Sequence, residues 1–130
     1  MPSVLCIDDS REGLAIRKEF LELKGYFVLT ATDGLTGLDL LASNRIDAVI
    51  LDYRMPRFSG KDVAREIKSR WPNVAIIMLS GYPEVPESAK DLSDAFVVKG
   101  ANPNVLLSEL DRLLGFRPLT AVERLRKKIA

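Results

Sequence analysis

The most constraining feature of the sequence is a short apolar run, Ala48 to Leu51, that ends on the carboxylate of Asp52. An uninterrupted apolar run of this length is typical of a strand buried on both faces, and such strands belong to parallel sheets. A charged side chain at the carboxyl end of a buried strand adds nothing to the core. It lies where open α/β sheets bind their ligands. Asp52 is therefore a candidate functional residue.

The composition limits the chemistry that the chain can perform. Its 130 residues contain no histidine, which excludes Ser-His-Asp and Cys-His catalysis and His-ligated zinc. Any bound metal must then be a hard cation on oxygen ligands. The single cysteine, Cys6, lies in an apolar run and is expected to be an inert core residue.

The sequence shows no targeting or membrane segment. No apolar run approaches the ~20 residues that span a bilayer, and the first residues lack the basic and apolar regions of a signal peptide. We therefore expect a cytoplasmic protein with no membrane partner. The net charge is +1 for the chain, but residues 116–130 carry five basic groups against Glu123. The preceding residues are net acidic, which argues against direct nucleic-acid binding by this domain.

Apolar runs and turn residues divide the chain into alternating strands and helices. Strands are predicted at 3–7, 26–30, 48–51, 74–79 and 95–98. Helices are predicted at 11–24, 34–44, 60–71 and 103–114, with a short, late helix between 82 and 93, where two prolines occur. In the first helix, Ile16, Phe20 and Leu23 form the expected apolar side.

Five strands alternating with helices predict an α/β fold, a doubly wound parallel sheet with helices on both faces, in one domain over residues 1–115. In the flavodoxin-like strand order 2-1-3-4-5, the first and third strands are neighbours. Asp8 and Asp9 end the first strand, and Asp52 ends the third. The fold therefore predicts that three carboxylates meet at one edge of the sheet.

A cation is expected among these carboxylates, because like charges at such distances raise one another's pKa unless a cation is present. Mg²⁺, held by a few carboxylates and water, suits the site. Ser80 and Lys99 end the fourth and fifth strands and bring a hydroxyl donor and a positive charge to the same edge. Together these residues predict phosphoryl transfer, with Asp52 as the in-line nucleophile.

The residues at the strand ends resemble those of the receiver domains of bacterial two-component response regulators, chemotaxis regulators included. The matching segments are Asp8-Asp9, Leu51-Asp-Tyr-Arg-Met-Pro56 with Gly60, Leu79-Ser-Gly81 and Phe96-Val-Val-Lys99. The resemblance covers residues 3–115. It implies a phosphorelay protein that receives a phosphoryl group from a sensor histidine kinase or phosphotransfer protein. Such a protein signals by conformational change to an output partner, as a monomer or a homodimer.

The resemblance also implies how the site is divided. Mg²⁺ would be bound directly by Asp9, Asp52 and the backbone carbonyl of Arg54. Asp8 would assist through a water molecule.

Four residues would control the signal. Ser80 would move toward the phosphoryl group, and Phe96 would follow it inward as an aromatic switch. Arg54 and Tyr82 would flank the path of the water that removes the phosphoryl group. Because both are large and neither is an obvious general base, we expect slow autodephosphorylation and no enzymatic turnover on other substrates.

Three departures from the family pattern stand out. Gly100 follows the lysine where proline is usual, so we expect a trans Lys99–Gly100 bond with glycine's φ freedom absorbing the altered path. The segment between Ser80 and Phe96 is about one helical turn shorter than usual. Phe96 replaces the more frequent tyrosine, which removes a hydroxyl.

Two other functions compete with an active receiver. A Mg²⁺-dependent aspartyl phosphohydrolase would usually place an acid two residues after the nucleophile, where this chain has Arg54. A degenerate receiver would act only as a protein-binding module, but the three carboxylates, Ser80 and Lys99 are all present.

Residues 116–130 are expected to form a basic amphipathic tail or the start of a linker. Residues 120–123 match a capping box, and Val122, Leu125 and Ile129 would form a short apolar stripe. So short a helix is unstable alone in water. It would either fray or dock on this domain or on a second copy.

Overall fold

The computed structural model describes residues 1–81, 86–115 and 121–129. Five parallel strands form one sheet of order β2-β1-β3-β4-β5. The strands are β1 (Ser3–Ile7), β2 (Phe27–Ala31), β3 (Ala48–Asp52), β4 (Ala75–Ser80) and β5 (Ala95–Val98). The predicted strand order is confirmed. In β3 all five residues are buried, as a central strand covered on both faces requires.

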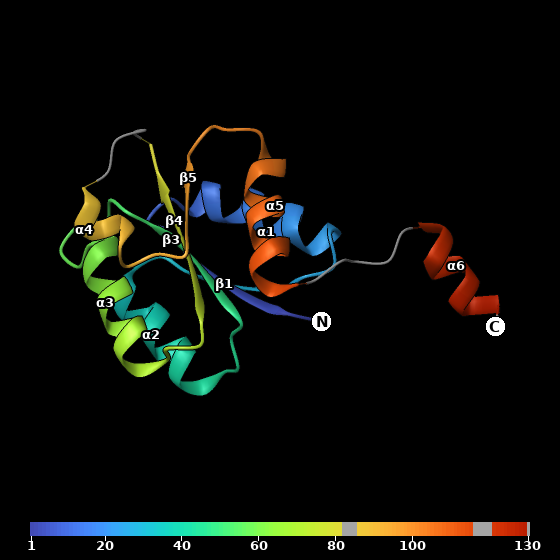
Figure 1. Cartoon of the computed structure of the whole chain (residues 1–130), viewed down its shortest axis with the longest axis horizontal. Coiled ribbons are helices and arrows are strands. Elements are labelled where there is room, and N and C mark those ends of the chain that lie inside the picture. The colour runs from blue at the N-terminus through green and yellow to red at the C-terminus, as the bar shows by residue number, and fades with distance from the viewer. Residues whose placement is uncertain (82–85, 116–120, 130) are drawn as a thin grey trace.

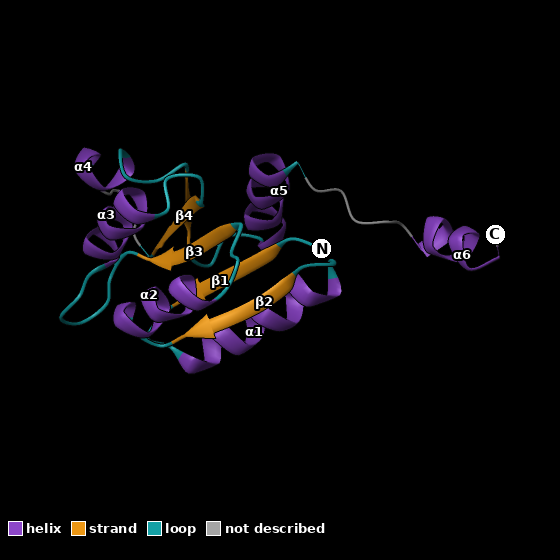
Figure 2. Ribbon diagram, turned by 90° about the horizontal axis from the view of Figure 1, so that it is seen from below, coloured by secondary structure: helices purple, strands orange, loops and turns teal. Residues whose placement is uncertain are grey.

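Helices cover both faces of the sheet (Figures 1 and 2). They are α1 (Arg11–Leu23), α2 (Gly34–Ser43), α3 (Gly60–Arg70), α4 (Glu87–Lys90) and α5 (Pro103–Leu114). A further helix, α6 (Ala121–Ile129), follows them in the chain and does not lie on the sheet. One apolar cluster joins the sheet to α2 and α3, and the other joins it to α1 and α5. No helix in the described part of the chain is long and apolar enough to cross a bilayer.

Side-chain caps begin several helices. The Ser10 hydroxyl accepts the Gly13 N–H at the start of α1, and Ser59 with Asp62 forms a capping box at α3. Asn102 caps α5, whose first residue is proline. These caps fix where each helix leaves the carboxyl edge of the sheet.

The predicted apolar side of α1 is wrong. Ile16 and Leu23 are 64% and 74% exposed, whereas Leu14 and Leu21 are buried against the sheet. Apolar residues lie on more than one side of this helix, so spacing alone selects the wrong set. The buried pair is separated by seven residues, two helical turns, and Arg17 lies between them on the same side.

The described residues show two of the departures from the family pattern. The four-residue α4 agrees with the short, late helix predicted there. The Lys99–Gly100 bond is trans, and Gly100 takes a φ of 86°, as expected for glycine in this position.

In α6 the stripe of Val122, Leu125 and Ile129 is exposed. The first residue of its expected capping box, Thr120, lies outside the described residues.

Candidate functional site

The sheet register brings the functional residues to one edge. Ile7 pairs with Leu51, so Asp8 follows β1 beside the end of β3, where Asp52 is the last residue. Ser80 pairs with Val98, so Lys99 leaves β5 beside the end of β4. The carboxyl ends of four neighbouring strands therefore supply the site.

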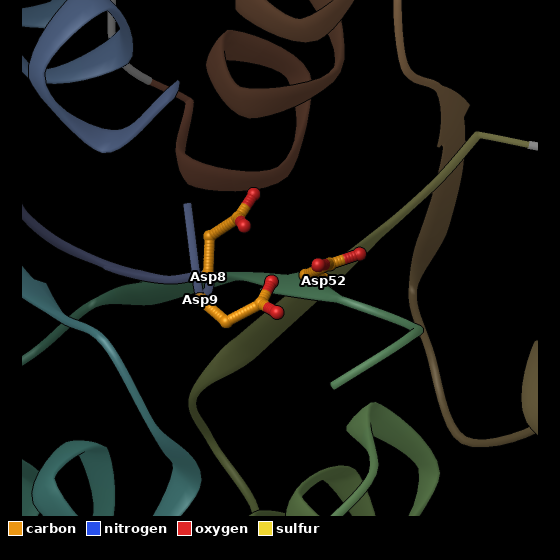
Figure 3. Close-up of side chains that lie close together, drawn as sticks. All are labelled: Asp8, Asp9 and Asp52. Carbon is orange, nitrogen blue, oxygen red and sulfur yellow. The ribbon is translucent and has the colours of Figure 1, made fainter. Parts of the chain in front are cut away.

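Three carboxylates gather at this edge (Figure 3). Asp8, Asp9 and Asp52 each offer one carboxylate oxygen, and these oxygens all lie within 4.8 Å of one another. Asp8 and Asp52 are buried, whereas Asp9 is exposed. Clustered carboxylates repel one another, so the fold must balance their charge.

Lys99 provides part of that balance. Its Nζ lies 3.0 Å from Oδ2 of Asp8 and 3.1 Å from Oδ2 of Asp52. Burial alone would lower the pKa of Lys99, but its hydrogen bonds to the two carboxylates raise it. Lys99 therefore remains a fixed positive charge beside Asp52 at neutral pH.

Asp8 has further donors. The Ser10 N–H donates to Oδ1 at 2.9 Å, and Nη2 of Arg17 donates to Oδ2 at 2.7 Å. Burial alone would raise the pKa of Asp8. The hydrogen bond from Ser10, followed by the two positive charges, instead holds that pKa below its ordinary value. Asp8 is therefore ionised at neutral pH.

The ionised form of Asp52 is stabilised less well by its surroundings than that of Asp8. Burial and then the charge of Asp8 raise the pKa of Asp52 above its ordinary value, and Lys99 opposes them. The backbone N–H of Arg54 donates to Oδ1 of Asp52 at 3.3 Å. A carboxylate that is poorly stabilised by its surroundings is well placed to bind a cation or to react as a nucleophile.

The backbone behind Asp52 is packed against α3. A Cβ added to Gly60 would lie 2.3 Å from the carbonyl oxygen of Asp52 and 2.7 Å from the Cα of Tyr53. The Gly60 N–H donates to the carbonyl of Tyr53 at 3.0 Å. Only glycine lets α3 begin so close to the end of β3, so this contact constrains the backbone that carries Asp52.

The comparisons with known proteins identify the family. The sequence profile of the response regulator receiver domain matches residues 4–111. The chain belongs to this family. Receiver domains are known for accepting phosphoryl groups. In this chain the acidic cluster lies at the carboxyl ends of β1 and β3.

Similar proteins support the same assignment. Response regulator MprA from Mycobacterium sp. (strain KMS) is 35% identical over 85% of this chain and 50% of its own length. The chain thus spans about half the length of such curated relatives. The response regulator TrrA from Thermotoga maritima, solved with Mg²⁺–BeF, is 34% identical with a TM-score of 0.83, over 88% of this chain and 100% of TrrA.

Chemotaxis regulators share the fold as well. CheY4 from Vibrio cholerae is 32% identical with a TM-score of 0.81, over 88% of this chain and 99% of its own. The flavodoxin-like fold predicted for this receiver is therefore confirmed.

The remaining predicted site residues differ in how deeply they are buried. Ser80 is buried at the end of β4, next to Lys99. Phe96 is half-buried against the cluster under α2 and α3, with Nζ of Lys90 5.9 Å from its ring centroid. The Arg54 side chain is exposed. Tyr82 lies outside the described residues, and its predicted role stays a prediction.

Arg17 is the site residue that sequence reasoning missed. A basic residue stands between Leu14 and Leu21, on the side of α1 that faces the sheet. A charge on the buried side of a helix needs a partner, and the strand-end carboxylates are close by. This signal can be read only once the side of α1 that faces the sheet is known.

Proposed function

We propose that this receiver accepts a phosphoryl group on Asp52 from a phosphohistidine of a sensor histidine kinase or phosphotransfer protein. The observation that carries the proposal is the buried Asp52 carboxylate, 3.1 Å from Lys99 and clustered with two further carboxylates at the sheet edge. An oxygen of Asp52 forms the new bond to phosphorus while the N–P bond of the donor breaks. The imidazole leaves with that electron pair.

Mg²⁺ fits the donor set of this site. Three carboxylates offer the hard oxygen ligands that Mg²⁺ prefers. We assign Asp9, Asp52 and the backbone carbonyl of Arg54 as its direct ligands, with Asp8 one water further out. Bound there, the ion would neutralise charge on the phosphoryl oxygens. TrrA, a similar receiver, was solved with Mg²⁺–BeF, which supports this assignment.

The other side chains at the edge have separate tasks. Lys99 holds positive charge beside the acceptor oxygen, where negative charge accumulates on the transferred group. Ser80 donates its hydroxyl to that group, and Phe96 follows the Ser80 movement inward. These movements carry the signal to an output partner, either from one receiver or from a homodimer.

Similar proteins support the proposed partner class. TrrA has been solved in complex with the histidine kinase ThkA, so we propose a histidine kinase as the donor for this cytoplasmic receiver. A self-contained phosphohydrolase is disfavoured, because Arg54 occupies the position where such an enzyme would carry an acid. A purely binding receiver would have no need of the intact acidic cluster with Lys99.

Beryllofluoride and acetyl phosphate test the proposal together. With Mg²⁺, intact-mass measurement should show one phosphoryl group per chain, and beryllofluoride should raise the melting temperature. Asp52→Asn should lose both effects. Asp39→Asn, which alters an exposed carboxylate on α2, is the matched control and should keep both. Equal phosphorylation of the two variants would contradict the proposal.

A further inference from the structure

Asp8 is held by a contact that phosphoryl transfer does not require. Nη2 of Arg17 donates to Oδ2 of Asp8 at 2.7 Å, the same oxygen that Lys99 approaches at 3.0 Å. The other oxygen accepts the Ser10 N–H at 2.9 Å. Both oxygens of Asp8 are therefore engaged by donors, and two of those donors are cations.

Arg17 is built into the fold to make this contact. Its side chain is only 17% exposed, and a Cβ added to Gly13 would lie 3.0 Å from its Nη2, so the glycine leaves room for the guanidinium. Nη1 is buried and has no hydrogen-bond partner among the residues that the structure describes. Burying a guanidinium with donors unused is costly, so the charge of Asp8 is what holds Arg17 in place.

We propose that Arg17 is a positioning residue that keeps Asp8 out of direct cation coordination and lowers the affinity of the acidic site for Mg²⁺. This inference rests on the proposed function, since it takes Asp9 and Asp52 as the cation ligands. With Arg17, two cationic side chains are paired with the buried carboxylates; without it, Lys99 keeps its pairs with Asp8 and Asp52 and the cluster loses one positive charge. A divalent cation is attracted more strongly as the net negative charge rises.

The coupling has a regulatory consequence. Cation binding and the Arg17–Asp8 contact oppose each other, and such coupling is reciprocal. Arg17 therefore raises the Mg²⁺ concentration that the receiver needs before it can accept a phosphoryl group. The device belongs to this chain's own α1 and acts without touching the transferred group.

Calorimetric titration of the full chain with MgCl₂ at constant ionic strength tests this role. Arg17→Leu, which continues the buried side of α1, should bind Mg²⁺ about three- to tenfold more tightly. Arg17→Lys keeps the charge and should stay near wild type. Lys18→Leu removes the same charge from a side of α1 away from the acidic site, in a groove with Glu19 and Glu22, and should change affinity less than twofold.

Melting temperatures separate positioning from plain stabilisation. Without Mg²⁺, Arg17→Leu should melt below wild type, because buried Asp8 loses a partner, and saturating Mg²⁺ should narrow that gap. A gap that stays constant, or unchanged or weaker Mg²⁺ binding by the variant, overturns the inference while leaving the proposed function intact. If the wild-type protein binds no Mg²⁺, this inference and the proposed Mg²⁺-dependent function both fail. Gly13→Ala, which crowds Nη2, should shift affinity in the same direction and decides the case if Arg17→Leu does not fold.

Discussion

Gly60 is the residue whose change most clearly links packing to the site. An alanine Cβ at this position would lie 2.3 Å from the carbonyl oxygen of Asp52 and 2.7 Å from the Cα of Tyr53. Both neighbours are backbone atoms, so the strain cannot be relieved by a side-chain rotation. Either α3 or the end of β3 must move, and overpacking of this kind costs about 3 kcal/mol.

Gly60→Ala should therefore lower both stability and phosphorylation. We expect the free energy of unfolding to fall by about 3 kcal/mol. Misplacing a reacting group by about 1 Å can cost on the order of a hundredfold in rate, so acetyl phosphate should label the variant at least roughly tenfold more slowly. Urea unfolding is readily followed by Trp71, the only tryptophan in the chain, which packs half-buried against the core under α2 and α3.

Gly81→Ala is the matched control. This glycine follows Ser80 at the same edge, but a Cβ there meets no atom within 4 Å among the described residues. The free energy of unfolding of this variant should change by less than about 1 kcal/mol. We expect an increase, because alanine restricts the unfolded chain. Equal stability and equal labelling rates for the two variants would refute the packing argument.

Two substitutions and one labelling experiment probe further features. Tyr26→Phe removes the hydrogen bond from the buried Tyr26 hydroxyl to Asp111 and should cost about 1.5–3 kcal/mol in urea unfolding; a loss below 0.5 kcal/mol would be too small for that bond. Burial raises the pKa of Cys6 to about 12, so a thiol reagent at pH 8 should label it only at the rate of unfolding; immediate labelling would contradict its burial. Arg54→Ala should shorten the lifetime of the phosphorylated protein, since the large Arg54 side chain is expected to flank the path of the attacking water and to hinder it; a longer lifetime would exclude this shielding.

The fold was predictable because its signals are local and repeated. Uninterrupted apolar strands such as Ala48–Asp52 and caps such as Ser10 and Asn102 each act within a few residues, and together they leave few topologies. Strand order then places Asp8 and Asp52 side by side. The acidic cluster was thus predictable from the sequence once the sheet was assigned.

What the sequence could not supply was the direction of individual side chains. The exposed Ile16 and the buried Leu14 are equally apolar, and only packing against the sheet distinguishes them. The pairing of Arg17 with Asp8 depends on that same helix rotation. The closeness of Gly60 to the backbone of Asp52 likewise requires three-dimensional coordinates.

Direct mapping of the phosphorylated residue tests the central claim most sharply. Borohydride reduces an aspartyl phosphate to homoserine, which marks the acceptor permanently for peptide mass spectrometry. After phosphorylation with acetyl phosphate and Mg²⁺, homoserine should be found at position 52 alone, and chelation of Mg²⁺ should abolish it. Homoserine at position 8 or 9 in the wild-type protein, or anywhere in Asp52→Asn, would contradict the assignment of Asp52 as the phosphoryl acceptor.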